Sequence, residues 1–397
     1  MIWISRTLLL VAALVAMPGA ARAQFVEAFE RAPLAVDQEQ ARKGWAFRTG
    51  DGEATVNFTA TGGIGTVTVD ARGDPRGIWW AMVRRSVSPT IDAEALARPD
   101  RELRVEARVR TDAAPRRINL HFNHSRTKDF HSHLLEYDLP DSGWHTITFT
   151  TKGFDAQPSD EVFVQLAMVD WGRQLFKLEI DYIKVSVVDP GKVGPDLGDP
   201  LPYRPEVPEV ASLQHHVPIT QDVTIDAAYP QVNFAAWTDW SAGVAVPALS
   251  VSGTQTIVLR PDLSAFRGRK PAGWGILELT TQSVQWANTE LEEFGYLRAL
   301  EILGGAVDWT RRTSTHANLL AGQPETTAFG QMFIDVPPSR ERGAKTYILV
   351  SPPVLERLIS GRTRGIAIVA QGALNASFAS SAATDPAMRP KLHFSMR

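Results

Sequence analysis

The sequence contains no cysteine in its 397 residues. This absence excludes disulfide bonds, zinc sites with thiolate ligands, cysteine nucleophiles and a lipidated N-terminal cysteine. The chain also has little excess of charge, since its formal net charge is −3. No overall field therefore draws it to nucleic acid or to an anionic membrane surface, and any electrostatic selectivity has to be local.

Long hydrophobic runs are missing as well. The run from Leu8 to Ala16 is well short of the ~20 residues that a membrane-spanning helix needs. Arg6 precedes this run and Ala21-Arg22-Ala23 follows it, which is the pattern of a signal peptide. We therefore expect residues 1–23 to be a signal peptide cleaved before Gln24, and the protein to be secreted or periplasmic without a membrane anchor.

The residues that are present predict an all-β protein. The composition, 44% hydrophobic and 21% charged, is that of a globular chain long enough for two or three domains of ~150 residues. From residue 25 to 188, short runs rich in Val, Ile, Thr and aromatic residues alternate with Gly, Asp and Pro turns, as in Ile118 to His124 and Val162 to Trp171. Many short strands without an amphipathic helix predict an antiparallel jelly-roll β-sandwich over residues 24–188.

A proline-rich segment divides the chain. Six prolines lie between Asp189 and Val210, and such composition favours an extended, semi-rigid linker over residues 189–210. The strand pattern then resumes, as in Gly365 to Ala370, and helical character is confined to short pieces such as Pro353 to Ile359. A second β-sandwich is therefore predicted over residues 211–397.

The first half resembles the galactose-binding-type jelly rolls of carbohydrate-binding modules. The resemblance rests on Glu27-Ala28-Phe29-Glu30, on Gly143-Trp144-His145-Thr146-Ile147 and on the run from Leu178 to Val185. In those modules the opening and closing strands often share a structural calcium ion. The resemblance thus implies Ca²⁺ at Glu30 and Asp181, with an acidic pair that holds no ion as the alternative.

The second half is similar to the DNRLRE-type β-sandwich domains of secreted polysaccharide-degrading enzymes. The similarity rests on the run from Leu259 to Ser264, on Val307-Asp308-Trp309-Thr310, and on Phe378-Ala379-Ser380 with Arg389-Pro390-Lys391-Leu392. It departs from that family by lacking an acidic residue after the serine. The similarity implies a carbohydrate-binding domain.

Four of the nine histidines fall between His121 and His133. Ile118, Leu120 and Phe122 alternate with Asn119, His121 and Asn123, so one face of this strand is apolar and the other carries polar side chains. A hairpin centred on Thr127 would place His121 opposite His133 and Asn123 opposite His131, with Tyr137 on the same face. A shift of one residue would destroy this arrangement, and Leu134 beside Leu135 leaves the phase open.

The surrounding segment is basic. Residues 101–133 carry eight basic side chains against four acidic ones, a local excess of +4. Arginine binds carboxylate and sulfate groups with two parallel hydrogen bonds, which favours an anionic glycan as the partner. A solvated face of paired charges is the alternative. The predicted substrate-binding residues are Arg104, Glu106, Arg108, Asn119, Asn123, Arg126, His131 and Trp171.

Three kinds of chemistry fit the histidine cluster. β-Elimination on a uronate chain needs a base and an acid beside the carboxylate, roles that His121, His133 and Tyr137 could fill without a cofactor. The pattern Arg104-x-Glu106-x-Arg108 with Asn119-x-His121 resembles jelly-roll alginate lyases by analogy, although Asn replaces Gln and the Tyr-Phe-Lys-Ala-Gly strand of that family is missing. Alternatively, His121, His131 and His133 could ligate Zn²⁺, or the face could bind a glycan without cleaving it.

The sequence therefore predicts a polysaccharide lyase acting on an anionic, uronate-containing glycan. The alternative is a non-catalytic protein with two carbohydrate-binding modules. Its many tryptophans favour sugar binding in either case, because an exposed indole stacks on a sugar ring.

Overall fold

The computed structural model describes residues 24–50, 52–74, 78–129, 132–171, 174–192, 194–195, 201, 205–240, 243, 245–286 and 295–397. The predicted signal peptide lies outside these residues. Strands dominate both halves, and each described strand pair is antiparallel, so the all-β prediction is confirmed. Within the described residues, no helix is both long and apolar enough to cross a membrane.

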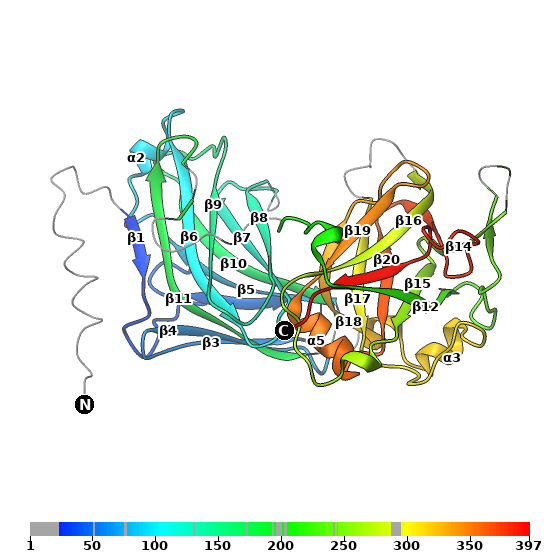
Figure 1. Ribbon diagram of the computed structural model, residues 1–397. Coiled ribbons are helices and arrows are strands. Elements are labelled where there is room, and N and C mark those ends of the chain that lie inside the picture. Colours follow the sequence, from blue (N-terminus) through cyan, green and yellow to red (C-terminus); the bar gives the residue numbers. More distant parts are fainter. Residues whose placement is uncertain are drawn as a thin grey trace.

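Two sheets make up the first half (Figure 1). The six-stranded sheet runs in the order β3 (Thr55–Thr61), β4 (Ile64–Asp70), β11 (Leu175–Val188), β6 (Glu102–Thr111) and β9 (His145–Thr150), and β1 (Gln24–Glu27) also pairs with β11. The five-stranded sheet has the order β2 (Ala46–Gly50), β5 (Ile78–Ser86), β10 (Val162–Trp171), β7 (Arg116–His124) and β8 (Leu134–Leu139). The short helix α2 (Ala93–Leu96) is capped by the Asp92 side chain.

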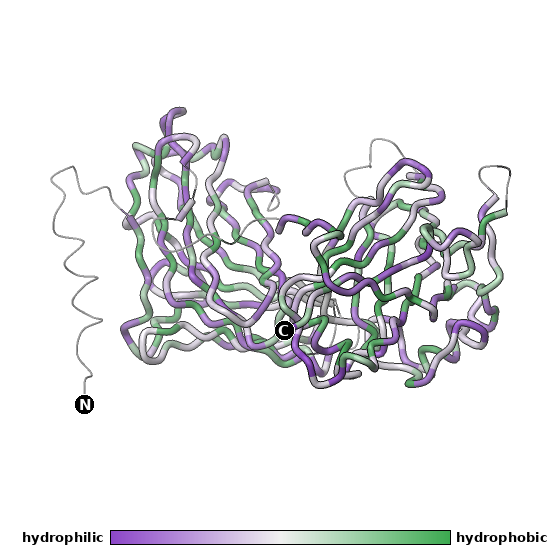
Figure 2. Tube along the Cα trace, viewed as in Figure 1, coloured by the Kyte–Doolittle hydropathy of each residue, from purple (hydrophilic) through white to green (hydrophobic). Residues whose placement is uncertain are grey.

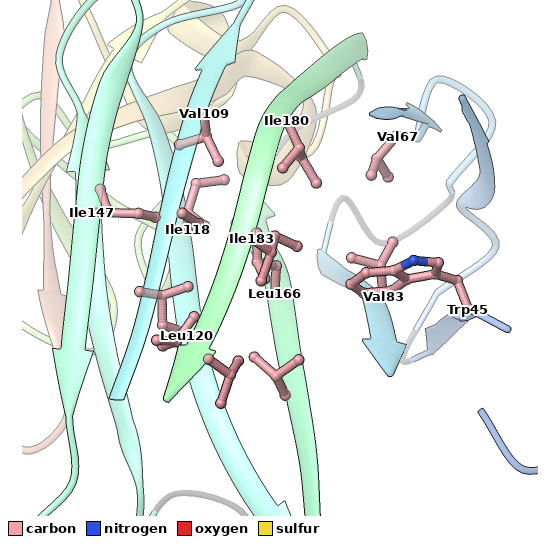
Figure 3. Packing of buried hydrophobic residues seen from close by; sticks show 14 of the residues in the cluster. Trp45, Val67, Val83, Val109, Ile118, Leu120, Ile147, Leu166, Ile180 and Ile183 are labelled. Atoms are coloured by element: carbon pink, nitrogen blue, oxygen red, sulfur yellow. The ribbon is translucent and has the colours of Figure 1, made fainter. Parts of the chain in front are cut away.

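The inner faces of these two sheets form one core (Figure 3). Strand alternation sends every second side chain inward, and fully buried examples are Val109, Ile180 and Ile183 from one sheet and Ile118, Leu120 and Leu166 from the other. Apolar and polar residues alternate along the strands (Figure 2). At one end Trp45 meets Phe29 and Phe58, with ring centroids 6.1 and 5.4 Å from its own, pairs that stabilise the core by about 0.5–1.5 kcal/mol each beyond burial.

The second half is a strongly bent sheet that folds over its own core. Long strands carry the bend: β12 (His215–Asp226) pairs with β22 (Lys391–Phe394) at its start and with β15 (Gln255–Pro261) afterwards. Likewise β16 (Gly275–Trp286) pairs first with β19 (Lys345–Val350) and then with β21 (Leu374–Ala379). The other strands are β13 (Thr238–Asp239), β14 (Val246–Val251), β17 (Tyr296–Ile302), β18 (Phe329–Val336) and β20 (Ile366–Gln371).

Helices of the second half are short. They are α3 (His316–Leu320), α4 (Glu325–Ala328), α5 (Pro352–Ser360) and the 3₁₀ turns η1 (Val210–Ser212) and η2 (Ser264–Phe266). The predicted helical piece near Pro353 is α5, which begins with proline, buries Val354, Leu355 and Leu358, and ends at Gly361 with φ 76°. Glycine adopts this left-handed conformation without the strain that a Cβ atom would cause.

The two halves contact each other through charged groups. Asp335 at the end of β18 accepts hydrogen bonds from Arg117 Nη1 of β7 at 2.9 Å and from Arg298 Nε of β17 at 2.8 Å. Arg117 also binds Asp138 of β8 with two 2.9 Å hydrogen bonds. Near this network, Arg357 Nη1 of α5 donates to the Ala114 carbonyl at 3.0 Å. The second half is therefore joined to the five-stranded sheet by partly buried ion pairs, with β18 lying against β10 and β7.

The proline-rich segment packs on the first half. The Lys192 and Gly194 carbonyls accept hydrogen bonds from Arg104, and Leu201 N donates to the Thr146 carbonyl at 2.8 Å. Lys192, Gly194 and Leu201 therefore lie against the outer side of the six-stranded sheet, within the segment that composition predicts to be an extended, semi-rigid linker.

Candidate functional site

The hairpin of β7 and β8 differs from the predicted one by a single residue. His121 pairs with Leu134, Asn119 with Glu136 and Ile118 with Tyr137. Because successive side chains alternate between faces, this shift turns Tyr137 to the same side as Ile118. The phenol is 4% exposed inside the core, and its hydroxyl donates to the Thr148 carbonyl at 2.5 Å. The prediction that Tyr137 shares a face with His121 is wrong.

His133 also lies on the inner side. Its ring contacts the Phe154 ring at 5.0 Å between centroids, and Phe154 in turn packs against Phe122. Burial lowers the pKa of His133. His121 and His133 thus occupy opposite faces of the strand pair. This separates two of the residues proposed as acid and base of the lyase. It also separates two of the three proposed zinc ligands. His131 lies outside the described residues, and those residues contain no group of three or more His, Asp or Glu able to hold a metal ion.

Polar side chains do line the outer face of the five-stranded sheet. Asn119, His121 and Asn123 of β7 share this face, as predicted, and β10 places Ala167, Gln165 and Phe163 opposite them. Beyond β10, the outward residues of β5 are Met82, Arg84 and Ser86. We call this surface the outer face and define it by Trp80, Arg84, Asn119, His121, Asn123 and Gln165.

The amide groups on the outer face are buried without full hydrogen bonding. Asn123 is 1% exposed, and neither its Oδ1 nor its Nδ2 has a partner. Asn119 Nδ2 donates to Glu136 Oε1 at 3.1 Å, but its Oδ1 is unpaired. Buried polar atoms are almost always paired, because an unpaired one costs about 1–3 kcal/mol. The amides of Asn119 and Asn123 are therefore under-bonded and closed to solvent, and Arg117 on the same face of β7 contacts Asp335 of the second half.

An arginine and a tryptophan lie beside these amides. The Arg84 guanidinium stacks 3.6 Å above the Phe163 ring centroid, and its Nε has no hydrogen-bond partner. Burial, and then the like charge of Arg48, lower the pKa of Arg84. Trp80 is half-buried and lies across β2, since a Cβ atom added to Gly50 would be only 2.2 Å from its Cζ2 atom. The lack of a side chain at Gly50 therefore lets the indole lie flat along the sheet.

Other predicted site residues lie elsewhere. Arg104, Glu106 and Arg108 belong to β6 in the six-stranded sheet, not to the sheet of Asn119. Arg104 and Glu106 are 3% and 2% exposed, because the proline-rich segment covers Arg104 and Tyr182 donates to Glu106 at 2.8 Å. The prediction that Arg104, Glu106 and Arg108 share a surface with Asn119 and His121 is therefore wrong. Consecutive strands of a sandwich often lie in different sheets.

The residues of the calcium hypothesis have other surroundings. The Asp181 carboxylate is 2.6 Å from Arg108 Nη1, so a cation already neutralises it, and Glu30 is exposed. The calcium site stays a prediction from the resemblance alone. Trp171 ends β10, and its side chain lies outside the described part of the structure.

Arg126, predicted to bind substrate, instead anchors a loop. Its guanidinium binds Asp160 through Nη2 at 2.8 Å and Nε at 3.0 Å. The hydrogen bond from Arg126 is the main reason that the pKa of Asp160 falls from its ordinary value of 3.8 to about 2. The side chain that was assigned to a ligand is therefore engaged within the protein.

This ion pair predicts a change of stability at acidic pH. A carboxylate whose pKa is lowered by folding stabilises the fold above its unfolded pKa, here 3.8, and this contribution is lost as the pH falls through about 2. Arg126→Ala should raise the pKa of Asp160 and reduce that acid dependence. Urea unfolding of both proteins at several pH values in this range checks it. Parallel losses of stability in the two proteins would contradict the assignment.

The sequence interpretation missed Trp80, Arg84 and Gln165 as members of the outer face. Signals for them exist: Gln165 is the single polar residue in the run from Val162 to Val169, and Trp80, Met82 and Arg84 alternate with the small apolar Ala81 and Val83. Only the strand order, which sets β5 beside β10 and β10 beside β7, brings these three residues next to Asn119 and Asn123.

Comparison with known proteins gives structural neighbours only. No protein-family model and no curated protein matches the chain. Among solved structures, one described as "CBM4 structure and function" has 18% identity and a TM-score of 0.30, and covers 41% of this chain and 97% of its own. The chain is distantly similar to β-sandwich carbohydrate-binding modules.

Two further neighbours come from Xyn10C of Paenibacillus barcinonensis. The CBM22-1 xylan-binding domain has 16% identity and a TM-score of 0.26, and covers 43% of this chain and 99% of its own. The CBM22-1-CBM22-2 tandem domain has 12% identity and a TM-score of 0.26, and covers 96% of this chain and 98% of its own.

Proposed function

We propose that this protein binds a polysaccharide on the outer face and does not cleave it. The observation that carries the proposal is the buried, unpaired amide of Asn123 beside Asn119 and Gln165. Sugar hydroxyl groups both donate and accept hydrogen bonds, as side-chain amides do. A row of such amides therefore matches successive hydroxyls along a glycan chain.

The position of the Trp80 indole also supports glycan binding. A half-buried indole lying flat over β2 offers one ring face to a sugar, and stacking there buries a large apolar area with little loss of side-chain freedom. Aromatic stacking and directional hydrogen bonds then come from neighbouring strands of one rigid sheet. A sheet is a firmer support for such a site than loops are.

Arg84 supports the proposal that the bound glycan is acidic. Its partly buried guanidinium has an unpaired Nε and forms no ion pair in the described part of the chain. A carboxylate on the ligand would gain charge-assisted hydrogen bonds there. We further propose, from the predicted signal peptide, that the protein acts outside the cytoplasm.

The separation of the predicted acid and base supports binding without cleavage. Tyr137 is used by the core and His133 packs on Phe154, so neither can exchange a proton with a sugar held beside His121. Among the described residues, the outer face therefore does not bring together His121, His133 and Tyr137, the proton-transfer groups that the lyase hypothesis required.

Asn123→Leu tests the proposal because it should weaken glycan binding without lowering the stability of the fold. Leucine is close to asparagine in size and removes both unpaired polar atoms, so the variant should be as stable as the parent or more stable, by up to about 1–3 kcal/mol. Binding of the preferred polysaccharide should fall about tenfold or more. The measurements are thermal unfolding and affinity electrophoresis or calorimetry with xylan, β-glucan, polygalacturonate, alginate and glucuronan.

Asn57→Leu is the matched control, because Asn57 is exposed on β3 of the other sheet. It should leave glycan binding unchanged. Arg84→Gln should weaken the binding of acidic polymers more than that of neutral ones. If Asn123→Leu lowers stability and binds normally, or if the parent retains none of these polymers, the proposal fails.

A further inference from the structure

A second site lies in the other half of the chain, apart from the outer face. A cavity of about 430 Å³ is lined by the middle of β12, the end of β15, the turn after α5 and the loop at Val307. This volume is within the range of about 300–1,000 Å³ that is usual for small-molecule sites.

Three arginines without a salt bridge in the described part of the chain distinguish this cavity. Arg260, Arg267 and Arg364 line it together with Asp262 and Asp308. None of the three guanidinium groups forms an ion pair with a carboxylate among the described residues. Most arginines near the contact between the halves behave differently, since Arg117, Arg298 and Arg357 each bind a carboxylate within 3 Å. The lining therefore carries three arginines against two aspartates, and Asp262, whose pKa is lowered by hydrogen bonds from Ser264 and also by the charges of Arg267 and Arg260, offsets part of the positive charge.

Two of these arginines are held in place by the loop at Val307, which lines the cavity. Arg260 Nη1 donates to the Val307 carbonyl at 3.4 Å, and its guanidinium stacks 5.1 Å from the Trp309 ring centroid. Arg364 Nη1 donates to the Gly305 carbonyl, and Trp309 Nε1 donates to the Arg364 carbonyl at 3.2 Å. The cations are thus positioned before a ligand arrives, which reduces the entropy lost on binding.

The remaining lining combines apolar surface with hydrogen-bond acceptors. Pro261, Leu263, Leu358 and Ile359 are buried and supply apolar contacts. Asp308 is exposed at the rim, and Asp262 uses Oδ1 to accept a 3.0 Å hydrogen bond from Ser264 N. Carboxylates at the rim can accept hydrogen bonds from hydroxyl groups but repel a bare anion.

We propose that this cavity binds an acidic sugar residue. The carboxylate of such a sugar pairs with the arginines, its hydroxyl groups donate to Asp308 and Asp262, and its ring covers the apolar surface. Inorganic sulfate or phosphate would bind the same arginines but would form no hydrogen bonds with the aspartates. The site is independent of the outer face, because it uses no residue of the first half.

The experiment measures calorimetric binding of galacturonate and glucuronate trisaccharides to the full mature chain and to its Asn123→Leu variant. Arg267→Ala and Arg260→Gln should each weaken binding at the cavity about tenfold, the loss expected for one charge-assisted contact. Arg269→Ala is the matched control, because it removes an exposed arginine from the same loop that does not line the cavity. Asp308→Ala should weaken binding of the acidic sugars while strengthening binding of sulfate.

Two results would overturn the proposal. One is binding of sulfate as tight as that of the sugar acids, with Asp308→Ala strengthening both, since the cavity would then be a simple anion site. The other is an equal effect of Arg267→Ala and Arg269→Ala. The Asn123→Leu variant separates the two proposals. If it loses binding at the outer face, calorimetric binding at the cavity should remain. If the cavity binds no acidic sugar, the effect of Asn123→Leu on polysaccharide binding is unchanged.

Discussion

Replacing Arg357 by methionine is expected to lower the free energy of unfolding by about 3–5 kcal/mol. Glu301 is fully buried, and Arg357 holds both of its carboxylate oxygens with hydrogen bonds of 2.8 and 2.7 Å. Removing the cation leaves a buried carboxylate with only the Thr363 hydroxyl, which donates to Glu301 Oε1 at 2.7 Å. Urea unfolding of the variant and the parent measures the difference.

Arg362→Met is the control for this experiment. Arg362 lies 3.7 Å from Glu356, and both side chains are more than half exposed, so its loss should change stability by about 0–1 kcal/mol. The double variant Glu301→Gln, Arg357→Met should recover most of the lost stability, because it removes the buried charge together with its partner. A double variant as unstable as Arg357→Met would show that the packing of the arginine, and not the ion pair, is responsible.

Arg117→Ala is expected to uncouple the two halves of the chain. Arg117 is the group that joins Asp138 of the first half to Asp335 of the second, and its side chain is 10% exposed. A loss of about 3 kcal/mol would lower the melting temperature by about 6–12 °C in a chain part of 150–250 residues. We expect one calorimetric transition in the parent, two in the variant, and faster proteolytic cleavage between residues 189 and 210.

Arg110→Ala removes a more exposed ion pair that does not join the halves. Arg110 pairs with Glu179 on the outer side of the six-stranded sheet, so this variant should keep one transition and the parent rate of cleavage. Two transitions in the parent itself would mean that the halves unfold independently despite their ionic contact.

Strand content could be predicted from the sequence because the alternation of apolar and polar residues is local. Ile118, Leu120 and Phe122 face inward as predicted, and all three are fully buried. The pairing of β7 with β8 could not be predicted, because Leu134 and Leu135 allow two registers and the sequence does not show which one the core uses. In the observed register Tyr137 pairs with Ile118, and its ring is buried in the core.

The composition of the candidate site depended on strand order, which alternation does not reveal. Arg104 in β6 and Asn119 in β7 follow similar patterns, yet the two strands belong to different sheets. Trp80 and Gln165 are distant in the sequence and share a face only because β5 and β10 are neighbours. Nor does proline content distinguish a free linker from one held by hydrogen bonds to Arg104.

The ionic contact between the halves has a consequence for avidity. A flexible tether would let two binding surfaces reach the same polymer over many spacings, and it would raise their effective concentration for almost any long chain. Here Arg117 and the packed segment at Arg104 restrain the halves, so the outer face and the cavity keep a set separation and direction. If both proposed sites bind the same polymer, this fixed spacing would favour chains whose length and curvature match it.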